Sequence, residues 1–454
     1  MSIEERIRPT TCQVRTNLAQ ANLRLSSTPA NRPSRVNSRV TPARFAASIS
    51  ILVWLFVCAI AAAQPSNRGW VATWQGSPTP GGTFYSPGCP SDVGLNNQTI
   101  RNVVHVSAGG DTVRVRVSNA AGSNPLAVGS ASIARSAGGA AAVSGTQRPL
   151  LFGGEGSILI AAGGEALSDP IPMTVHPLDT LDVSVYLPGS TGPSTQHYYA
   201  DQDNFLAAGD ATGASAATAF TTQISCWMFV SGVDVHTDGR VLGTLIAFGD
   251  SITDGYLSTN DANHRYPDDL ARALASRKGD TLSVVNAGII GNELLTIRPQ
   301  LEFGYTAPFR FARDAANQPG ARAVILLEGI NDIGDRSAKA SDLIPVYEQL
   351  ILAAHEAGLR IYGATLTPFG GSNAIYGGDY GTPAGEAQRQ LVNAWIRTSG
   401  AFDGVIDFDK AVRDPANPTQ LLPAYVGDPL HPNDAGYQAM ANAVNLEAII
   451  DAID

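Results

Sequence analysis

The sequence predicts an α/β protein in two parts: an all-β sandwich over residues 64–240, followed by a three-layer α/β/α domain over residues 241–454. Two observations carry this prediction. From Trp70 to about Gly239 the chain consists of short β-branched segments between Gly, Pro, Ser and Asp turns, with no stretch of ten residues at helical period. After residue 240 apolar strands alternate with amphipathic helices, which is the pattern of a parallel sheet covered on both faces.

The composition agrees with many strands and turns. The 454 residues include 46 glycines and 28 prolines, and charged residues make up 15%, against roughly 25% in an average soluble protein. The formal net charge is −10, but residues 1–63 hold eight arginines against two glutamates, so the rest carries 22 basic and 38 acidic groups. A nucleic-acid binder needs basic side chains to neutralise phosphates, so the charge excludes that class of protein.

An uncharged, mostly apolar segment at residues 45–63 follows four arginines and ends in three alanines before Gln64-Pro65. This order of basic, apolar and small residues is typical of a secretory signal peptide, cleaved here near Gln64. Residues 1–63 are therefore predicted to be a leader with its signal peptide, and the mature protein to be secreted or periplasmic. A membrane anchor through residues 45–63 stays open as the alternative, since about 18 apolar residues can span a bilayer.

The cysteines agree with export. Cys12 and Cys58 lie in the leader, which leaves Cys89 and Cys226 in the mature chain. An even pair in an exported protein predicts one disulfide, and two buried free thiols are the alternative.

The first part contains strands with clear period-2 patterns. Segments such as residues 102–107, 126–133, 157–160, 180–187 and 226–235 are rich in β-branched residues. At residues 112–118 three valines alternate with Arg114, Arg116 and Ser118, which predicts a half-buried strand. A β-sandwich of jelly-roll type is the expected architecture.

The second part has five predicted strands and four predicted helices. The strands are residues 242–248, 282–286, 323–327, 360–365 and 404–407, and the helices are residues 267–277, 343–357, 386–398 and 434–453. Ligands of parallel sheets bind beyond the carboxyl ends of the strands, so residues that carry chemistry should directly follow strands.

Two of the predicted loops carry a serine and a histidine beside a carboxylate. Ser251 follows the first strand in the stretch Gly-Asp-Ser-Ile and stands before a helix start. A serine hydroxyl becomes a good nucleophile only when a base takes its proton. Asp428 and His431, three residues apart between prolines, can supply the base and the acid that orients it.

Two further loops carry groups that can stabilise an anion. Gly291 follows the second strand, where a backbone N–H can approach a substrate oxygen without a Cβ in the way. Asn331 follows the third strand and offers a side-chain amide. With the Ser251 N–H these groups make three candidate donors to an oxyanion.

These motifs, Gly249–Ile252, Gly291, Gly329–Asp332 and Asp428–His431, occur in the order found in the SGNH (GDSL-like) hydrolases, and residues 241–454 resemble that family. The resemblance implies a flavodoxin-like three-layer fold, with Ser251, Gly291, Asn331 and His431 at the family's four defining positions and Asp428 as the orienting acid. The mature chain also resembles secreted bacterial members that are grouped with acetylxylan-esterase-like proteins.

The resemblance implies a serine esterase that needs no metal or organic cofactor. The expected substrate is a small ester or an acylated carbohydrate, most plausibly an acetyl ester of the xylan type. A broad arylesterase, lysophospholipase or thioesterase stays open, as does a non-catalytic carbohydrate-binding surface protein. We expect a monomer, with no nucleic-acid partner and no stable membrane partner once the signal is cleaved.

For some residues two interpretations stay open. The loop at residues 369–382 is either a substrate-facing lid or an ordinary surface loop. Four aromatic residues of the first part either stack on sugars or belong to the core: Trp74, Tyr198, Tyr199 and Trp227. The histidines other than His431 are interpreted as structural: His105, His176, His197, His236, His264 and His355. Asp250 and Asp332 are each expected to fix their own loop by hydrogen bonds to backbone N–H groups.

Overall fold

The computed structural model describes residues 69–82, 88–237 and 239–453, and these belong to one compact unit. The predicted leader and signal peptide lie outside the described residues. Within the described part of the chain, no helix is both long enough and apolar enough to cross a membrane.

The chain from Trp70 to His236 forms antiparallel strands. Their bounds are β1 (Trp70–Gln75), β2 (Thr79–Pro80), β3 (Gln98–His105), β4 (Gly110–Ser118), β5 (Leu126–Val128), β6 (Ser130–Gly138), β7 (Ala141–Ala142), β8 (Arg148–Pro149), β9 (Ile158–Ile160), β10 (Glu165–Leu167), β11 (Ile171–Val175), β12 (Thr180–Leu187), β13 (Thr195–His197), β14 (Asn204–Ala208), β15 (Thr222–Ile224), β16 (Trp227–Met228) and β17 (Val230–His236). A 3₁₀ turn lies at Ala217–Ala219.

These strands form a sandwich of two main sheets. One sheet has the order β1–β17–β4–β10, with β11 also paired to β4, and the other has the order β15–β14–β3–β12–β6–β7, with β8 paired to β6. Two small sheets, β16–β13–β2 and β5–β9, complete this part. Apolar side chains of both main sheets, such as Val115 of β4 and Val183 of β12, are fully buried in one core.

The strand β4 is more buried than the predicted half-buried strand: on the face opposite the valines, Arg114 and Ser118 are buried, and Thr112 and Arg116 are partly exposed. Its valines face the sandwich core, and on the other face Arg114 forms an ion pair of 2.8 Å with Asp234 of β17. The Arg114 guanidinium also lies 4.3 Å from the ring centre of Trp70. Arginines that alternate with valines predict a solvent-exposed face only when no other group packs on them. Here the Asp234 carboxylate and the Trp70 ring cover Arg114.

The first strand joins the sandwich to the second part of the chain. Ala72 belongs to the apolar core of the α/β part, and its N–H donates to Pro319 O at 3.0 Å. The Gln75 amide donates to Asp314 O at 3.0 Å. The sandwich therefore shares its first strand with the core that follows it.

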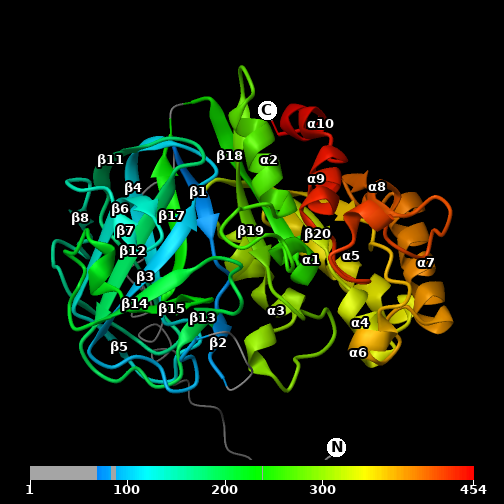
Figure 1. The fold of residues 1–454 in the computed structure, drawn as a ribbon. Helices are drawn as coiled ribbons and strands as arrows, with labels where there is room; N and C mark the ends of the chain where they lie inside the picture. Colours follow the sequence, from blue (N-terminus) through cyan, green and yellow to red (C-terminus); the bar gives the residue numbers. More distant parts are fainter. Residues whose placement is uncertain (1–68, 83–87, 238, 454) are drawn as a thin grey trace, which may run out of the picture. The chain divides into compact units, whose positions relative to one another are not determined.

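From Val241 onward the chain forms a parallel sheet with helices on both faces (Figure 1). Its strands are β18 (Val241–Gly249), β19 (Thr281–Gly288), β20 (Ala321–Leu327), β21 (Arg360–Ala364) and β22 (Gly404–Ile406). They lie in the order β19–β18–β20–β21–β22, which is the flavodoxin-like order. Each of the five predicted strands falls on one of them.

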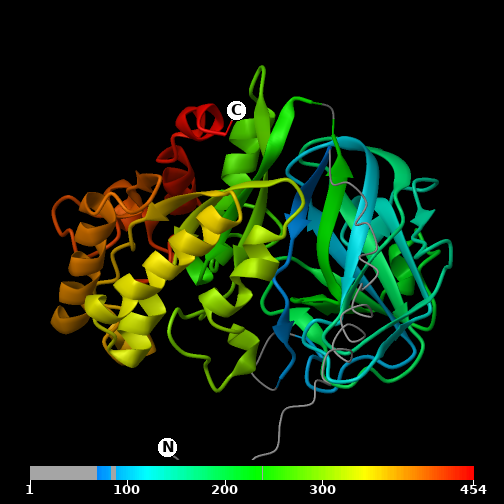
Figure 2. The same ribbon diagram turned by 180° about the vertical axis from the view of Figure 1, so that it is seen from behind.

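The helices of this part are α1 (Ser251–Asp254), α2 (Tyr266–Ala275), α3 (Ala307–Phe311), α4 (Ile330–Arg336), α5 (Ala340–Glu356), α6 (Asn373–Tyr376), α7 (Pro383–Thr398), α8 (Phe408–Val412), α9 (Asp434–Asn442) and α10 (Leu446–Asp451). A π-helical turn, Ala312–Ala316, continues α3. Helix α2 packs against α9 on one face of the sheet, while α5 contacts α3 and α7 on the other. Figure 2, the view from behind, shows α3 and α5 in front of the sheet.

The sequence predicts one helix over residues 434–453, and the structure has two. Helix α9 ends at Asn442, and α10 begins at Leu446. Asn445 caps the second helix, because its side-chain oxygen accepts a hydrogen bond from Ala448 N at 3.2 Å. The predicted strand at residues 126–133 is likewise divided into β5 and β6, with Gly129 between them.

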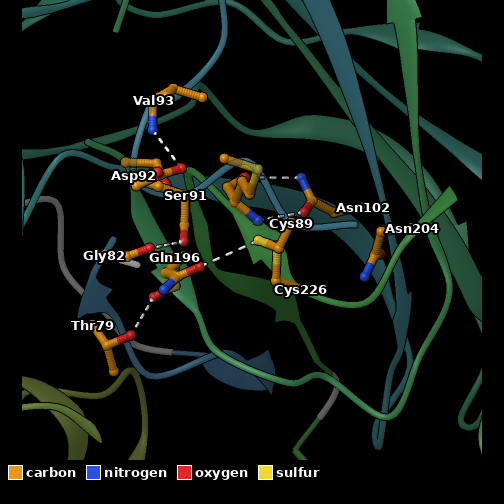
Figure 3. The surroundings of a disulfide bond; sticks show 12 residues. Thr79, Gly82, Cys89, Ser91, Asp92, Val93, Asn102, Gln196, Asn204 and Cys226 are labelled. Atoms are coloured by element: carbon orange, nitrogen blue, oxygen red, sulfur yellow. Dashed lines mark hydrogen bonds between the residues drawn. A yellow bond between two sulfur atoms is a disulfide. The ribbon is translucent and has the colours of Figure 1, made fainter. Parts of the chain in front are cut away.

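Cys89 and Cys226 form the predicted disulfide, with a Cα–Cα distance of 6.0 Å. Figure 3 shows that the Gln196 side chain of β13 lies beside the bond, with its oxygen 3.3 Å from Cys89 Sγ. Next to Cys226, the Asn102 side chain accepts from Met228 N and donates to Met228 O. The disulfide therefore joins the loop before β3 to strands that hydrogen-bond with β3 and β13.

Reduction of this disulfide should destabilise the protein by about 4–5 kcal/mol, because the bond closes a loop with a sequence separation of 137 residues. We expect a lower midpoint in urea denaturation for the reduced protein. The Cys89→Ala/Cys226→Ala double variant should show a similar shift and no further response to dithiothreitol. An unchanged midpoint after complete reduction would contradict this expectation.

Candidate active site

The residues that sequence analysis selects all lie at the carboxyl edge of the parallel sheet. Ser251 is the first residue of α1, directly after β18, and is 3% exposed. Asp250 fixes this turn as expected, since its side chain accepts a hydrogen bond from Ile252 N at 2.9 Å. A side chain at Gly249 would lie 2.4 Å from Leu327 O, so only glycine fits between the strand and the turn.

Ser251, His431 and Asp428 form a continuous chain of hydrogen-bonding contacts. Ser251 Oγ lies 2.9 Å from His431 Nε2. On the other side of the ring, His431 Nδ1 lies 3.1 Å from both carboxylate oxygens of Asp428. The hydroxyl, imidazole and carboxylate thus have the order and spacing of a serine-hydrolase triad.

The Asp428 carboxylate is held in an environment that favours its charge. Burial raises its pKa, but the hydrogen bond and the electrostatic interaction with His431, together with the hydrogen bond from the Tyr376 hydroxyl, lower it by more. The net result is a pKa well below the usual range of an aspartate. One oxygen also accepts from Leu430 N and His431 N at 2.7 Å each. The carboxylate is therefore ionised and fixed beside the imidazole.

The Asn331 amide is held in one orientation. Its oxygen accepts a hydrogen bond from the Tyr380 hydroxyl at 2.7 Å, and its nitrogen donates to Asn292 O at 2.9 Å. An amide nitrogen has two hydrogens, so one N–H remains. Asn331 lines the same pocket as Ser251 and His431.

Gly291 occupies a turn that follows β19. Its φ of +71° lies in the left-handed region, and a Cβ there would lie 2.8 Å from the Phe303 ring. Sequence analysis attributes the glycine to the space that an approaching substrate needs. In the structure, the positive φ angle and the nearby Phe303 ring already require a residue without a side chain. Among the described residues, no atom accepts a hydrogen bond from Gly291 N.

A buried arginine joins the three loops that follow β18, β19 and β20. Arg310 of α3 donates to Gly249 O at 2.8 Å and to Ala287 O at 2.7 Å. It also donates to Asn292 Oδ1, Glu328 Oε1 and Asp314 Oδ2, and it is 1% exposed. These five bonds equal the number of guanidinium N–H groups. Sequence analysis missed Arg310, because its partners lie on four separate segments.

Buried carboxyl groups surround this arginine. Burial raises the pKa of Asp250 to about 7 and that of Asp332 to about 7, and it raises the pKa of Glu328 as well. The sequence predicts that Asp332 fixes its own loop. In the structure its carboxylate instead accepts hydrogen bonds from the neighbouring loop. Its two oxygens accept from Leu294 N and Leu295 N, each at 2.9 Å. The loop after β20 thereby holds the loop that contains Gly291.

A pocket of about 770 Å³ opens at this edge of the sheet and contains Ser251, Gly291, Asn331 and His431. Its aromatic lining residues are Tyr198, Tyr199, Tyr256, Phe303, Tyr376 and Tyr380. Tyr198 and Tyr199 come from the β-sandwich, so that part contributes to the pocket wall. Trp74 and Trp227 instead belong to the sandwich core and pack edge to face, with ring centres 5.1 Å apart.

The loop at residues 369–382 contributes two tyrosines to the site. The Tyr376 hydroxyl donates to Asp428 Oδ2 at 2.6 Å, and Tyr380 orients Asn331 as described above. Arg298 donates to the Tyr380 hydroxyl at 3.2 Å, which leaves the tyrosine hydrogen for Asn331. Sequence analysis left this loop open as a substrate-facing lid or an ordinary surface loop and gave no role to Tyr376 or Tyr380.

The parallel sheet and the Ser251–His431–Asp428 contacts agree with the geometry expected from the sequence. Residues 247–439 match the model of the GDSL-like Lipase/Acylhydrolase family. This match supports that family for the α/β part of the chain, and the family implies an ester hydrolase. No curated protein matches the chain.

Solved structures with a distant likeness come from several bacteria. One is titled a putative lipolytic protein of the G-D-S-L family from Desulfitobacterium hafniense (19% identity, 44% of this chain and 97% of that chain, TM-score 0.34). Another is a carbohydrate acetylesterase family member from Sinorhizobium meliloti (17% identity, 46% of this chain and 98% of that chain, TM-score 0.36). A third is the aryl esterase of M. smegmatis (13% identity, 44% of this chain and 95% of that chain, TM-score 0.36). At these scores they do not bear on the substrate of this chain.

Replacing Arg310 by methionine should destabilise the protein by about 3–5 kcal/mol, because Glu328 and Asp314 would lose a buried cationic partner. Urea denaturation measures the change. Arg322→Met is the matched control, since Arg322 is exposed and, within the described part of the chain, makes only one long hydrogen bond, 3.4 Å to Leu242 O. Equal midpoints for the two variants would refute the central role given to Arg310.

Proposed function

We propose that this protein is a secreted serine esterase that removes small acyl groups, in particular acetyl groups, from carbohydrate of the xylan type. The main support for esterase activity is the contact of 2.9 Å between Ser251 Oγ and His431 Nε2, together with an ionised Asp428 beside the imidazole. The disulfide between Cys89 and Cys226 supports export, since such bonds persist in oxidising compartments.

In this mechanism Ser251 Oγ attacks the carbonyl carbon of the ester while His431 Nε2 takes the hydroxyl proton. His431 then gives that proton to the leaving alcohol, and an acyl group remains on Ser251. A water molecule, deprotonated by His431, attacks this acyl group and releases the carboxylic acid. Asp428 holds Nδ1–H and stabilises the charged ring during both steps.

The developing oxyanion is stabilised by three donors: the N–H groups of Ser251 and Gly291 and the remaining N–H of Asn331. Donors that are fixed before the reaction need no reorganisation as charge develops, and the loss of one typically costs about 10²–10³ in rate. The contacts of Asn331 with Tyr380 and Asn292 support this role, because they hold the amide in one rotamer.

The tyrosines of the pocket support a carbohydrate substrate. A tyrosine presents a flat apolar ring and a polar hydroxyl, which suits a sugar with its apolar faces and hydroxyl edges. The same aromatic wall, with Phe303 and Leu430, also fits an aryl or a longer acyl group. A broad arylesterase is therefore the second candidate.

The first test is hydrolysis of p-nitrophenyl esters from acetate to palmitate by the wild-type protein and by Ser251→Ala. We expect turnover on acetate that falls steeply beyond butyrate and a loss of about 10⁴-fold or more in the variant. Release of acetate from acetylated xylo-oligosaccharides should accompany it. A maximum on long chains would favour a lipid ester, and equal rates in both proteins would refute the role of Ser251.

Tyr380→Phe should lower kcat on p-nitrophenyl acetate by about tenfold, because a hydrogen bond that orients Asn331 is worth about 1 kcal/mol or more. The matched control is Tyr186→Phe, which removes an equivalent tyrosine–asparagine bond of 2.7 Å to Asn97 in the sandwich. That variant should keep the wild-type kcat. Equal kcat values for all three proteins would contradict the role given to Tyr380.

A further inference from the structure

A histidine of the β-sandwich is bonded to the helix that carries Ser251. His197 ends strand β13, is 3% exposed and packs against the Trp227 ring. Its Nε2 lies 3.0 Å from Asp254 Oδ1, and Asp254 is the last residue of α1. The contact therefore connects the two parts of the chain within one turn of the serine.

Both ring nitrogens of His197 face acceptors. Nδ1 lies 3.1 Å from Ser77 O, which can only accept, and Nε2 faces a carboxylate. A ring that donates to both acceptors carries a hydrogen on each nitrogen and is therefore an imidazolium. Burial and Arg265 lower the pKa of His197, but Asp254 and the hydrogen bonds raise it to a net value above that of a free histidine.

Asp254 transmits this contact to the turn that contains Gly291. Its second oxygen, Oδ2, accepts a hydrogen bond from Ile290 N at 3.1 Å. Ile289 N is held by Gly249 O at 3.0 Å. The two N–H groups before Gly291 are therefore fixed on the Ser251 turn, which determines where the Gly291 N–H points.

We propose that His197 is a positioning residue for the oxyanion site: it holds Asp254, and Asp254 holds Ile290 and so places the Gly291 N–H. The inference rests on the proposed esterase function. It gives the β-sandwich a part in the rate of reaction as well as in the pocket wall. The histidine acts through Asp254 and touches neither the substrate nor Ser251.

The test compares kcat and KM on p-nitrophenyl acetate for the full chain carrying His197→Gln or His197→Ala. We expect kcat to fall about 10–100-fold, less than the 10²–10³ lost when a donor is removed outright, with KM changed less than about threefold. A change confined to KM would overturn the proposal, because it would assign His197 to support of the pocket wall at Tyr198 and Tyr199.

A matched control exists elsewhere in the chain. His355 lies 2.9 Å from Asp403, and the same carboxylate oxygen accepts from Ile361 N at 2.8 Å. This histidine–aspartate–amide series lies at the start of β21, away from the pocket. His355→Gln should keep the wild-type kcat, and a loss equal to that of His197→Gln would overturn the proposal.

A double-mutant cycle with Asp254→Ala separates positioning from general stability. If His197 acts through Asp254, adding His197→Ala to that variant should change kcat by less than about threefold. Additive losses would overturn the proposal. Absence of turnover in the folded wild-type protein would instead overturn the esterase function itself.

Hydrogen exchange gives a readout that does not depend on turnover. The peptide covering residues 286–294 should exchange faster in His197→Gln than in the wild type or in His355→Gln, because Ile290 N–H loses a fixed acceptor. Unchanged exchange in this peptide would overturn the proposal, even if the variant had a lower kcat.

Discussion

The site depends on a buried arginine that none of the four sequence motifs contains. Arg310 donates to the backbone at the ends of β18 and β19 and to the Glu328 side chain after β20. A guanidinium has a fixed, planar set of five donors, so it constrains the distances between these loops. Ser251, Gly291 and Asn331 each lie in or directly beside one of the loops that it joins.

The acidic groups beside Arg310 explain how the loops support one another. Asp250 accepts from its own turn, but Asp332 accepts from the neighbouring loop at Leu294 and Leu295. Burial raises the pKa of both carboxyl groups to about 7, because desolvation disfavours their charged forms. Such buried groups are stable only when hydrogen bonds replace water, and the backbone N–H groups of the site loops provide them.

The sequence was sufficient to predict the strands of the parallel sheet and the candidate site residues that follow them. Apolar strands bounded by helices have a strong local pattern, and Ser251, Asn331 and His431 stand beside glycines and prolines that mark turns. The roles of Arg310, His197 and Tyr380 could not be predicted in this way. The contacts that define them, Arg310 with Gly249 and Glu328, His197 with Asp254, and Tyr380 with Asn331, each join residues that are between 18 and 61 positions apart. The burial of Arg114 was missed for the same reason, since its cover comes from Trp70 and Asp234.

These long-range contacts change the interpretation of the β-sandwich. An independent module would contact the α/β part through exposed polar residues, yet Ala72 lies in the α/β core and His197 is paired with Asp254 in a buried position. Arg265 also donates to Asp201 O, next to the two tyrosines that line the pocket. Because the sandwich supplies both a pocket wall and a charged contact to the serine helix, changes in it should alter catalysis as well as stability.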